Sequence, residues 1–138
     1  MPYIIFTFKI GSMEKKEKFA MPECREQLVA IKDVMELLSG KWKLQIVGSL
    51  LFVGKMRFMD LRRAVDGIAA KMLSKELQEL EQNELITRKE LHTKPITVEY
   101  ELTPHGKTLG PLIFTISSWG VSHRKWLFRK KKVAEKAP

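Results

Sequence analysis

The segment from residue 69 to residue 83 carries the side chains best suited to binding chemistry. Its hydrophobic spacing predicts a helix, and one side of that helix gathers ammonium, hydroxyl and amide groups: Lys71, Ser74, Lys75 and Gln78. Such groups can donate hydrogen bonds to phosphate oxygens and to the edges of DNA bases. A helix N-terminus also favours anions, because its free N–H groups point outward. An ordinary amphipathic surface helix would look similar, and this segment alone leaves both interpretations open.

The chain offers little material for other chemistry. Its histidines, His92, His105 and His123, lie far apart, and with one distant cysteine they show no metal-ligand spacing. No glycine-rich phosphate loop, nucleophile motif or pair of catalytic carboxylates is visible. We therefore predict no enzyme activity, no catalytic residues, no metal site and no cofactor.

Composition indicates a folded domain with a polyanionic partner. The 138 residues are 44% hydrophobic and 30% charged, which suits one domain with a packed core. The formal net charge is +9, which favours nucleic acid as the partner, and an anionic membrane is the second choice. No apolar run approaches the roughly 20 residues that a spanning helix needs, so no membrane insertion is expected. The single cysteine, Cys24, and the lack of a visible secretory leader predict a cytoplasmic protein.

Periodicity predicts four helices in the first two thirds of the chain. Apolar residues recur at three- and four-residue steps over 24–39, where Gly40 would end the helix, and again over 41–53. A short third helix is expected over 57–64, with Arg57 at its start. A tight turn at Asp66-Gly67 follows, in which Ile68 would be buried, and then comes the helix over 69–83 with Leu73, Leu77 and Leu80 inward.

The period then changes to that of strands. Residues 85–92 and 96–103 alternate between apolar and polar, and the loop 93–95 joins them, which predicts a β-hairpin. Thr103 is placed to cap a following helix, with Pro104 as its first residue. That last helix is expected over 104–128, with Gly110-Pro111 able to kink it.

Both ends of the chain are set apart from this domain. Residues 1–20 are expected to be an N-terminal extension, either a stretch upstream of a true start at Met13 or a real strand. Residues 21–128 would form the domain, and residues 129–138 a frayed basic tail. The cations at 129–132 could touch DNA, although a solvated run of charge is the commoner interpretation.

Helix, helix, short helix, turn, helix, hairpin, long helix is the order of a winged helix-turn-helix, a mostly α fold with a small β-hairpin wing (α+β). Spaced motifs make the likeness more specific. They are Gly40-Lys41-Trp42, Arg57-Phe58 with Leu61, Gly67-Ile68, Lys71-Met72-Leu73 with Leu77, Leu80-Glu81, Val98-Glu99-Tyr100 with Leu102-Thr103, Gly106, and Trp119-Gly120. In these motifs, from about Cys24 to Gly120, the chain resembles the HxlR-type regulators of the MarR-like superfamily.

The resemblance implies a homodimeric bacterial or archaeal transcriptional regulator. In that family the fourth helix enters the major groove and the wing reaches the flanking minor groove or phosphates. Carried onto this chain, Lys71, Ser74, Lys75 and Gln78 are the base-reading candidates. Arg57 would contact phosphate, and His92, Thr93 and Lys94 would form the wing tip.

The family also pairs its subunits through terminal helices. Here the residues expected at the dimer interface are apolar or aromatic: Leu28, Ile31, Leu112, Ile116 and Trp119. Trp42 and Phe58 are expected in the core or at the interface rather than in a ligand cage.

Two positions depart from the family pattern. Asn83-Glu84 replaces the usual glycine-containing pair after the fourth helix and suits a left-handed cap less well. Ala69 replaces the usual N-cap hydroxyl, which leaves the start of that helix open.

Some HxlR-type regulators sense oxidants through an N-terminal cysteine, and Cys24 lies in the corresponding region. A structural or incidental cysteine is the favoured interpretation, and a sensor would act through an inter-subunit or mixed disulfide. The resulting hypothesis is a sequence-specific double-stranded DNA-binding repressor on a pseudo-palindromic operator, with a small-molecule or redox effector left open. The alternative is a winged-helix adaptor that binds an acidic protein.

Overall fold

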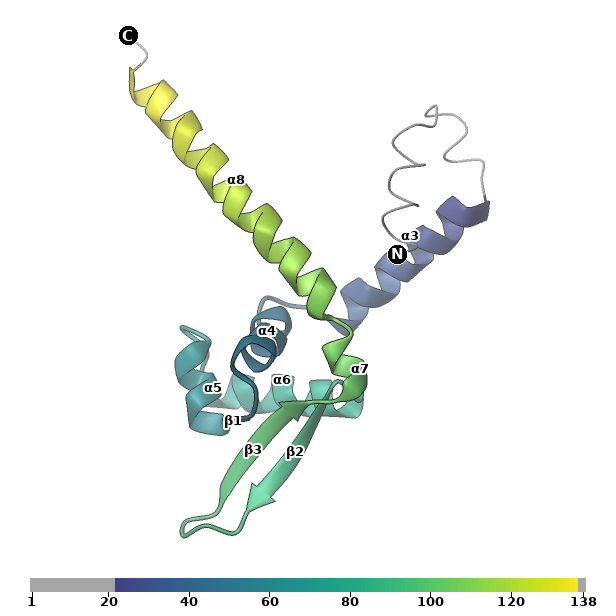
Figure 1. Cartoon of the computed structure of the whole chain (residues 1–138), viewed down its shortest axis with the longest axis vertical. Helices are drawn as coiled ribbons and strands as arrows, with labels where there is room; N and C mark the ends of the chain where they lie inside the picture. The colour runs from purple at the N-terminus through teal and green to yellow at the C-terminus, as the bar shows by residue number, and fades with distance from the viewer. Residues whose placement is uncertain (1–21, 137–138) are drawn as a thin grey trace. The chain divides into compact units, whose positions relative to one another are not determined.

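The computed structural model describes residues 22–136, which form helices and one small sheet (Figure 1). The chain divides into two compact units, residues 1–39 and residues 40–138. Helix α3 (Pro22–Leu37) belongs to the first unit. The second holds α4 (Lys43–Val53), β1 (Met56–Arg57), α5 (Phe58–Ala64), α6 (Ala70–Gln82), β2 (Ile86–Leu91), β3 (Thr97–Leu102), α7 (Pro104–Lys107) and α8 (Gly110–Lys136). The predictions for residues 1–20 concern a segment outside the described residues.

The core of the second unit lies where α4, α5, α6 and the base of the sheet meet. Its fully buried side chains are aliphatic and come from all of these elements: Ile46, Val47, Leu61, Val65, Leu73, Leu77, Leu80, Leu85 and Ile86. The three inward leucines of α6 are buried as its periodicity predicts, and Ile68 in the preceding turn is buried too. Gly67 takes a φ of 85°, a value that favours glycine, and so allows α5 and α6 to be joined by a tight turn.

Helix α6 ends in a Schellman motif, although its C-terminal residues were expected to suit one poorly. The Leu85 N–H donates to the Leu80 carbonyl at 3.0 Å, and the Glu84 N–H donates to the Glu81 carbonyl at 3.0 Å. Glu84 itself takes the left-handed position, with φ of 60°. The sequence therefore places a residue with a Cβ where the motif favours glycine, and the turn forms nonetheless.

The sheet has three strands in the order β1-β3-β2, rather than the two of the expected hairpin. Strand β1 is two residues long and pairs Met56 with Tyr100 and Arg57 with Glu99. The prediction that Arg57 begins the third helix was therefore wrong, because this residue is in the sheet and α5 begins at Phe58. Hydrogen bonding to β3 holds Arg57 in an extended conformation. A strand of two residues is too short to show the alternation of apolar and polar residues that predicts strands.

One side chain joins the end of α6, the wing and α7. Thr103 caps α7 as predicted, since its Oγ1 accepts from the Gly106 N–H at 2.9 Å, and it donates to the Glu84 carbonyl at 2.7 Å. Gly106 packs so closely on the Leu85 backbone that a Cβ there would lie 2.1 Å from the Leu85 carbonyl oxygen. The base of the wing is therefore a tight junction that only glycine fits.

The expected single helix over 104–128 is two helices, and this prediction is corrected in two respects. The short α7 ends at Lys107 and α8 begins at Gly110, because Pro111 suits a first turn better than a helix interior. Helix α8 then continues through Lys136, so residues 129–136 of the tail that was expected to fray are helical. Phe114 of α8 packs edge-on against Phe52 of α4, with ring centroids 5.3 Å apart. Within residues 22–136, no helix is long and apolar enough to cross a membrane.

Candidate nucleic-acid interface

The outer side of α6 is polar and exposed. Lys71, Ser74, Lys75 and Gln78 are all exposed, while the leucines on the opposite side are buried. The helix begins at Ala70, and its N-cap Ala69 provides no side-chain hydrogen bond. The N–H groups of the first turn therefore have no side-chain cap and remain available to an anion such as a phosphate.

An open groove of about 980 Å³ runs between α5, α6 and the wing. Three of the residues expected to contact DNA line it, namely Arg57, Ser74 and Gln78. Lys71 and Lys75 are on the same helix but are not among its lining residues. The groove is also lined by Arg63, Arg88, Ile96 and Tyr100, so it combines cationic, amide, hydroxyl and apolar groups with the carboxylates of Asp60 and Glu81. Such a mixture suits a nucleic-acid backbone and base edges better than a small apolar ligand.

Two arginines of the groove were missed by the sequence reasoning. Arg63 makes an ion pair with Asp60 at 2.6 Å. Arg88 lies opposite Tyr100 in the sheet and contacts Glu90 at 3.3 Å. A hydrogen bond with Tyr100, more than the charge of Glu90, raises the pKa of Arg88. The strand alternation that predicted the hairpin could have placed Arg88 on one face of the wing, but it could not show that this face lies toward α6.

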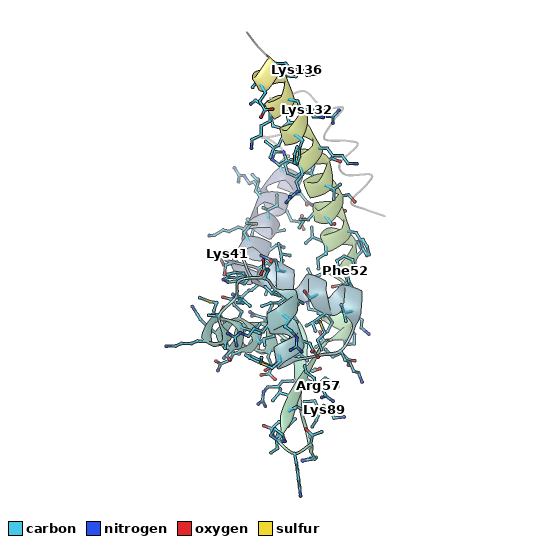
Figure 2. All side chains as sticks on the ribbon, turned by 90° about the vertical axis from the view of Figure 1, so that its left-hand side faces the viewer. Lys41, Phe52, Arg57, Lys89, Lys132 and Lys136 are labelled. Carbon is cyan, nitrogen blue, oxygen red and sulfur yellow. The ribbon has the colours of Figure 1, made fainter. Side chains whose placement is uncertain are left out.

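A row of charged residues crosses the sheet. Arg57 is aligned with Glu99, and Glu99 is aligned with Lys89, so the three residues share one face of the sheet. Figure 2 shows Arg57 and Lys89 together at the wing. All three strands thus contribute to a charged surface, of which the sequence analysis had identified only Arg57.

The wing tip is exposed at His92, Thr93 and Lys94. The Thr93 hydroxyl is engaged within the loop, since it donates to the Pro95 carbonyl at 2.8 Å and lies 3.0 Å from the Thr97 hydroxyl. Thr93 therefore shapes the tip, whereas His92 and Lys94 present their side chains to solvent. The role of all three in DNA binding remains a prediction.

A buried ion-pair cluster fixes α6 from behind. Lys43 of α4 is only 3% exposed, and its Nζ lies 2.6 Å from Glu76 and 2.5 Å from Glu79, both on α6. Burial opposes the charge of the ammonium group, but the hydrogen bonds and charges of the two glutamates outweigh it and raise the pKa of Lys43 above 10.5. The hydrogen bond from Lys43 lowers the pKa of Glu79 below 4.5. These bonds tie α6 to α4.

The remaining predicted residues lie on the two long helices. The five expected at a dimer interface are between 37% and 68% exposed: Leu28, Ile31, Leu112, Ile116 and Trp119. Trp42 and Phe58 are half-buried, and Cys24 in α3 is half-buried with a free thiol. No group of three histidine, cysteine or carboxylate side chains able to hold a metal ion occurs within residues 22–136.

The three-stranded wing, the α5–α6 pair and the exposed polar side of α6 define a winged helix-turn-helix protein. Residues 37–127 match the family model described as HxlR-like helix-turn-helix, so the chain belongs to that family. The relatives are DNA-binding transcriptional regulators rather than enzymes, and this chain is an HTH-type transcriptional regulator of the same kind.

Individual relatives cover most of the chain. The HTH-type transcriptional regulator YdzF of Bacillus subtilis (strain 168) is 38% identical over 99 residues, which span 72% of this chain and 91% of YdzF. The structure of a MarR-family regulator from Porphyromonas gingivalis W83 is 36% identical with a TM-score of 0.62, over 66% of this chain and 88% of its own. The structure of the redox regulator HypR in its reduced form is 34% identical with a TM-score of 0.67, over 72% of this chain and 98% of the HypR chain.

Proposed function

We propose that this regulator binds double-stranded DNA sequence-specifically as a cytoplasmic homodimer and represses transcription by occluding a promoter. The observation that carries the proposal is the groove between α6 and the wing, where Ser74 and Gln78 lie beside Arg57, Arg63 and Arg88. Amide and hydroxyl groups at this position suit base edges in a major groove, and the arginines suit the flanking phosphates.

The homodimer is supported by apolar side chains that the core leaves uncovered. Trp119 is 68% exposed and Ile116 is 46% exposed on α8, and Leu28 is 58% exposed on α3. Large apolar residues gathered on exposed helix faces are typical of protein–protein interfaces. A two-fold dimer would read a pseudo-palindromic operator with its two α6 helices about 34 Å apart, one turn of DNA.

Binding to native DNA tests the proposal directly. Purified protein is titrated against its own upstream intergenic duplex and against a shuffled duplex of equal length, at physiological salt. We expect a preference of about 10³ or more for the native fragment. Weak, salt-sensitive binding to both duplexes would contradict sequence-specific regulation, and tight binding to an acidic protein instead would favour an adaptor.

Cys24 is the residue through which a redox effector would act on this regulator. The similar protein HypR is named a redox regulator, and its structures are of reduced and oxidised forms. The same titration with a mild thiol oxidant, repeated on Cys24→Ser, separates the interpretations. Loss of the preference on oxidation in the natural protein alone makes Cys24 the sensor. An equal response in both proteins makes it an incidental cysteine.

A further inference from the structure

The last turns of α8 hold most of the excess charge of the chain. Residues 124–136, here called the basic end of α8, contain seven cations and one acid, Glu135, for a net charge of +6 out of +9 for the whole sequence. Every residue of this segment is exposed. None of its cations takes part in an ion pair within residues 22–136. These charges are therefore unneutralised and concentrated on about three and a half helical turns.

The basic end of α8 lies far from the DNA-reading surface of the same unit. Helix α8 has 27 residues and is therefore about 40 Å long. Figure 2 shows Lys132 and Lys136 at one end of the view and Arg57 and Lys89 at the other. A duplex seated against α6 and the wing would lie at the opposite end from these cations, so they are left for a different polyanion.

The two sides of this segment differ. Along one side, Trp119, His123 and Trp126 stack with ring centroids 4.9 and 5.7 Å apart, and the Lys130 ammonium lies 5.1 Å from the centre of the Trp126 ring. At about 100° per residue, the other side carries four cations: Arg124, Lys125, Lys131 and Lys132. Pairing of two α8 helices through the aromatic side would leave these four cations facing outward.

The charge pattern favours a phosphate backbone over a lipid surface. A helix that lies in a membrane interface needs a continuous apolar side. Here Lys130 interrupts the aromatic side, and Phe128 falls among the cations of the other side. A nucleic-acid backbone requires only closely spaced cations, because its affinity comes from the release of counterions.

We propose that the basic end of α8 is a second, sequence-independent binding surface for the phosphate backbone of duplex DNA, so that one regulator molecule can hold two duplex segments. The proposal rests on the proposed function only in that duplex DNA is the partner. Five of the seven cations of this segment lie beyond the end of the family match at residue 127.

A capture experiment tests this second surface. The native upstream duplex is fixed to beads, the full-length protein is bound and unbound protein is washed away. A fluorescent duplex of unrelated sequence is then added. The natural protein is expected to retain the second duplex, and the variant R124Q/K125Q/K131Q/K132Q to retain at least tenfold less while still binding the first. For the four-residue variant, the slope of log K against log salt on unrelated DNA should be shallower than that of the natural protein by at least two, because each phosphate contact contributes about 0.9.

The variant K71Q/K75Q serves as the matched control, because it removes cations from α6 and leaves α8 intact. It should weaken binding to the fixed duplex but keep the part of the salt slope that α8 supplies. Thermal melting of both variants should match that of the natural protein, since all six residues are exposed. If the natural protein shows no sequence preference but capture still depends on α8, the proposed function fails and the second surface stands.

Two results would overturn the proposal. One is equal capture and equal salt slope for the natural protein and the four-residue α8 variant. The other is α8-dependent binding to phosphatidylglycerol vesicles or to an acidic protein without α8-dependent binding to duplex DNA, which would assign the segment to another partner.

Discussion

The two sides of α6 carry charge in opposite ways. On the outer side, Lys71 and Lys75 are exposed and make no ion pair within residues 22–136. On the inner side, Glu76 is 6% exposed and its carboxylate is bound by the buried Lys43. Helix α6 can therefore be held in place by bonds on the side that faces the core and still leave the cations of its outer side available to a ligand. Changes on the inner side should act on stability, and changes on the outer side on DNA binding.

The largest effect is expected from the inner side. Lys43→Ala removes the cation between two glutamates and leaves Glu76 buried without its partner, which should destabilise the fold by about 3–5 kcal/mol. Urea unfolding measures this loss, and Lys75→Ala is the control, expected within about 0.5 kcal/mol of the natural protein. A loss of under 1 kcal/mol in Lys43→Ala would mean that the buried cluster does not hold α6.

The next effect is expected from the outer side and should appear in binding alone. Gln78→Ala removes an amide that faces the groove, and should cost about 1–3 kcal/mol of operator affinity and relax preference at one base position. Titration against a panel of single-base operator variants measures this. Lys75→Gln is the companion, expected to weaken binding to all sequences and to make the salt slope shallower by about one. Unchanged profiles in both variants would remove α6 as the reading helix.

A smaller effect of opposite sign is expected at the end of α6. Glu84 holds a left-handed conformation, with φ of 60°, which costs a residue with a Cβ about 1–2 kcal/mol. Glu84→Gly relieves this strain but gains flexibility in the unfolded chain, so a net stabilisation of about 0.5–1 kcal/mol is expected in urea unfolding. Asn83→Gly is the control, because Asn83 has a φ of −87° and gains nothing from glycine. Equal effects at both positions would argue against strain at Glu84.

The smallest effect concerns pH. The hydrogen bond from Lys43 lowers the pKa of Glu79 below 4.5, so this bond stabilises the fold above pH 4.5 and is lost as pH falls through the lowered pKa. Glu79→Gln should therefore show a shallower loss of unfolding free energy below pH 4.5 than the natural protein. Urea unfolding over a pH series measures both slopes, and parallel curves would show that Glu79 is not coupled to Lys43.

The helices that pack through leucines could be predicted, and the contacts between distant residues could not. The spacing of Leu73, Leu77 and Leu80 identified α6 to within a residue at each end, because a buried stripe leaves a strong period. Lys43 and Glu76 are 33 positions apart in the chain, and nothing local marks either as buried. Strand β1 was missed for a similar reason, because its two residues are extended only through pairing with β3.

The site was predicted in part, and the missing part also depends on tertiary structure. The spacing of its leucines predicted which side of α6 is polar, and Ser74 and Gln78 on that side line the groove. Arg63 and Arg88 join them only because α5 and the wing fold toward α6, which no spacing in the sequence reveals. The length of α8 was underestimated, since a run of lysines suggests a solvated tail although lysine is a good helix former.

The junction at Thr103 has a mechanical consequence. Its hydroxyl binds the Glu84 carbonyl and caps α7, its N–H donates to the Leu85 carbonyl at 3.0 Å, and the Leu85 N–H donates back to Leu80 inside α6. Gly106 rests directly on that same Leu85 carbonyl. Hydrogen bonds at one junction therefore link the end of α6, the base of the wing and the start of α7, which leads to α8. A torque applied along α8 would therefore reach α6 through these hydrogen bonds.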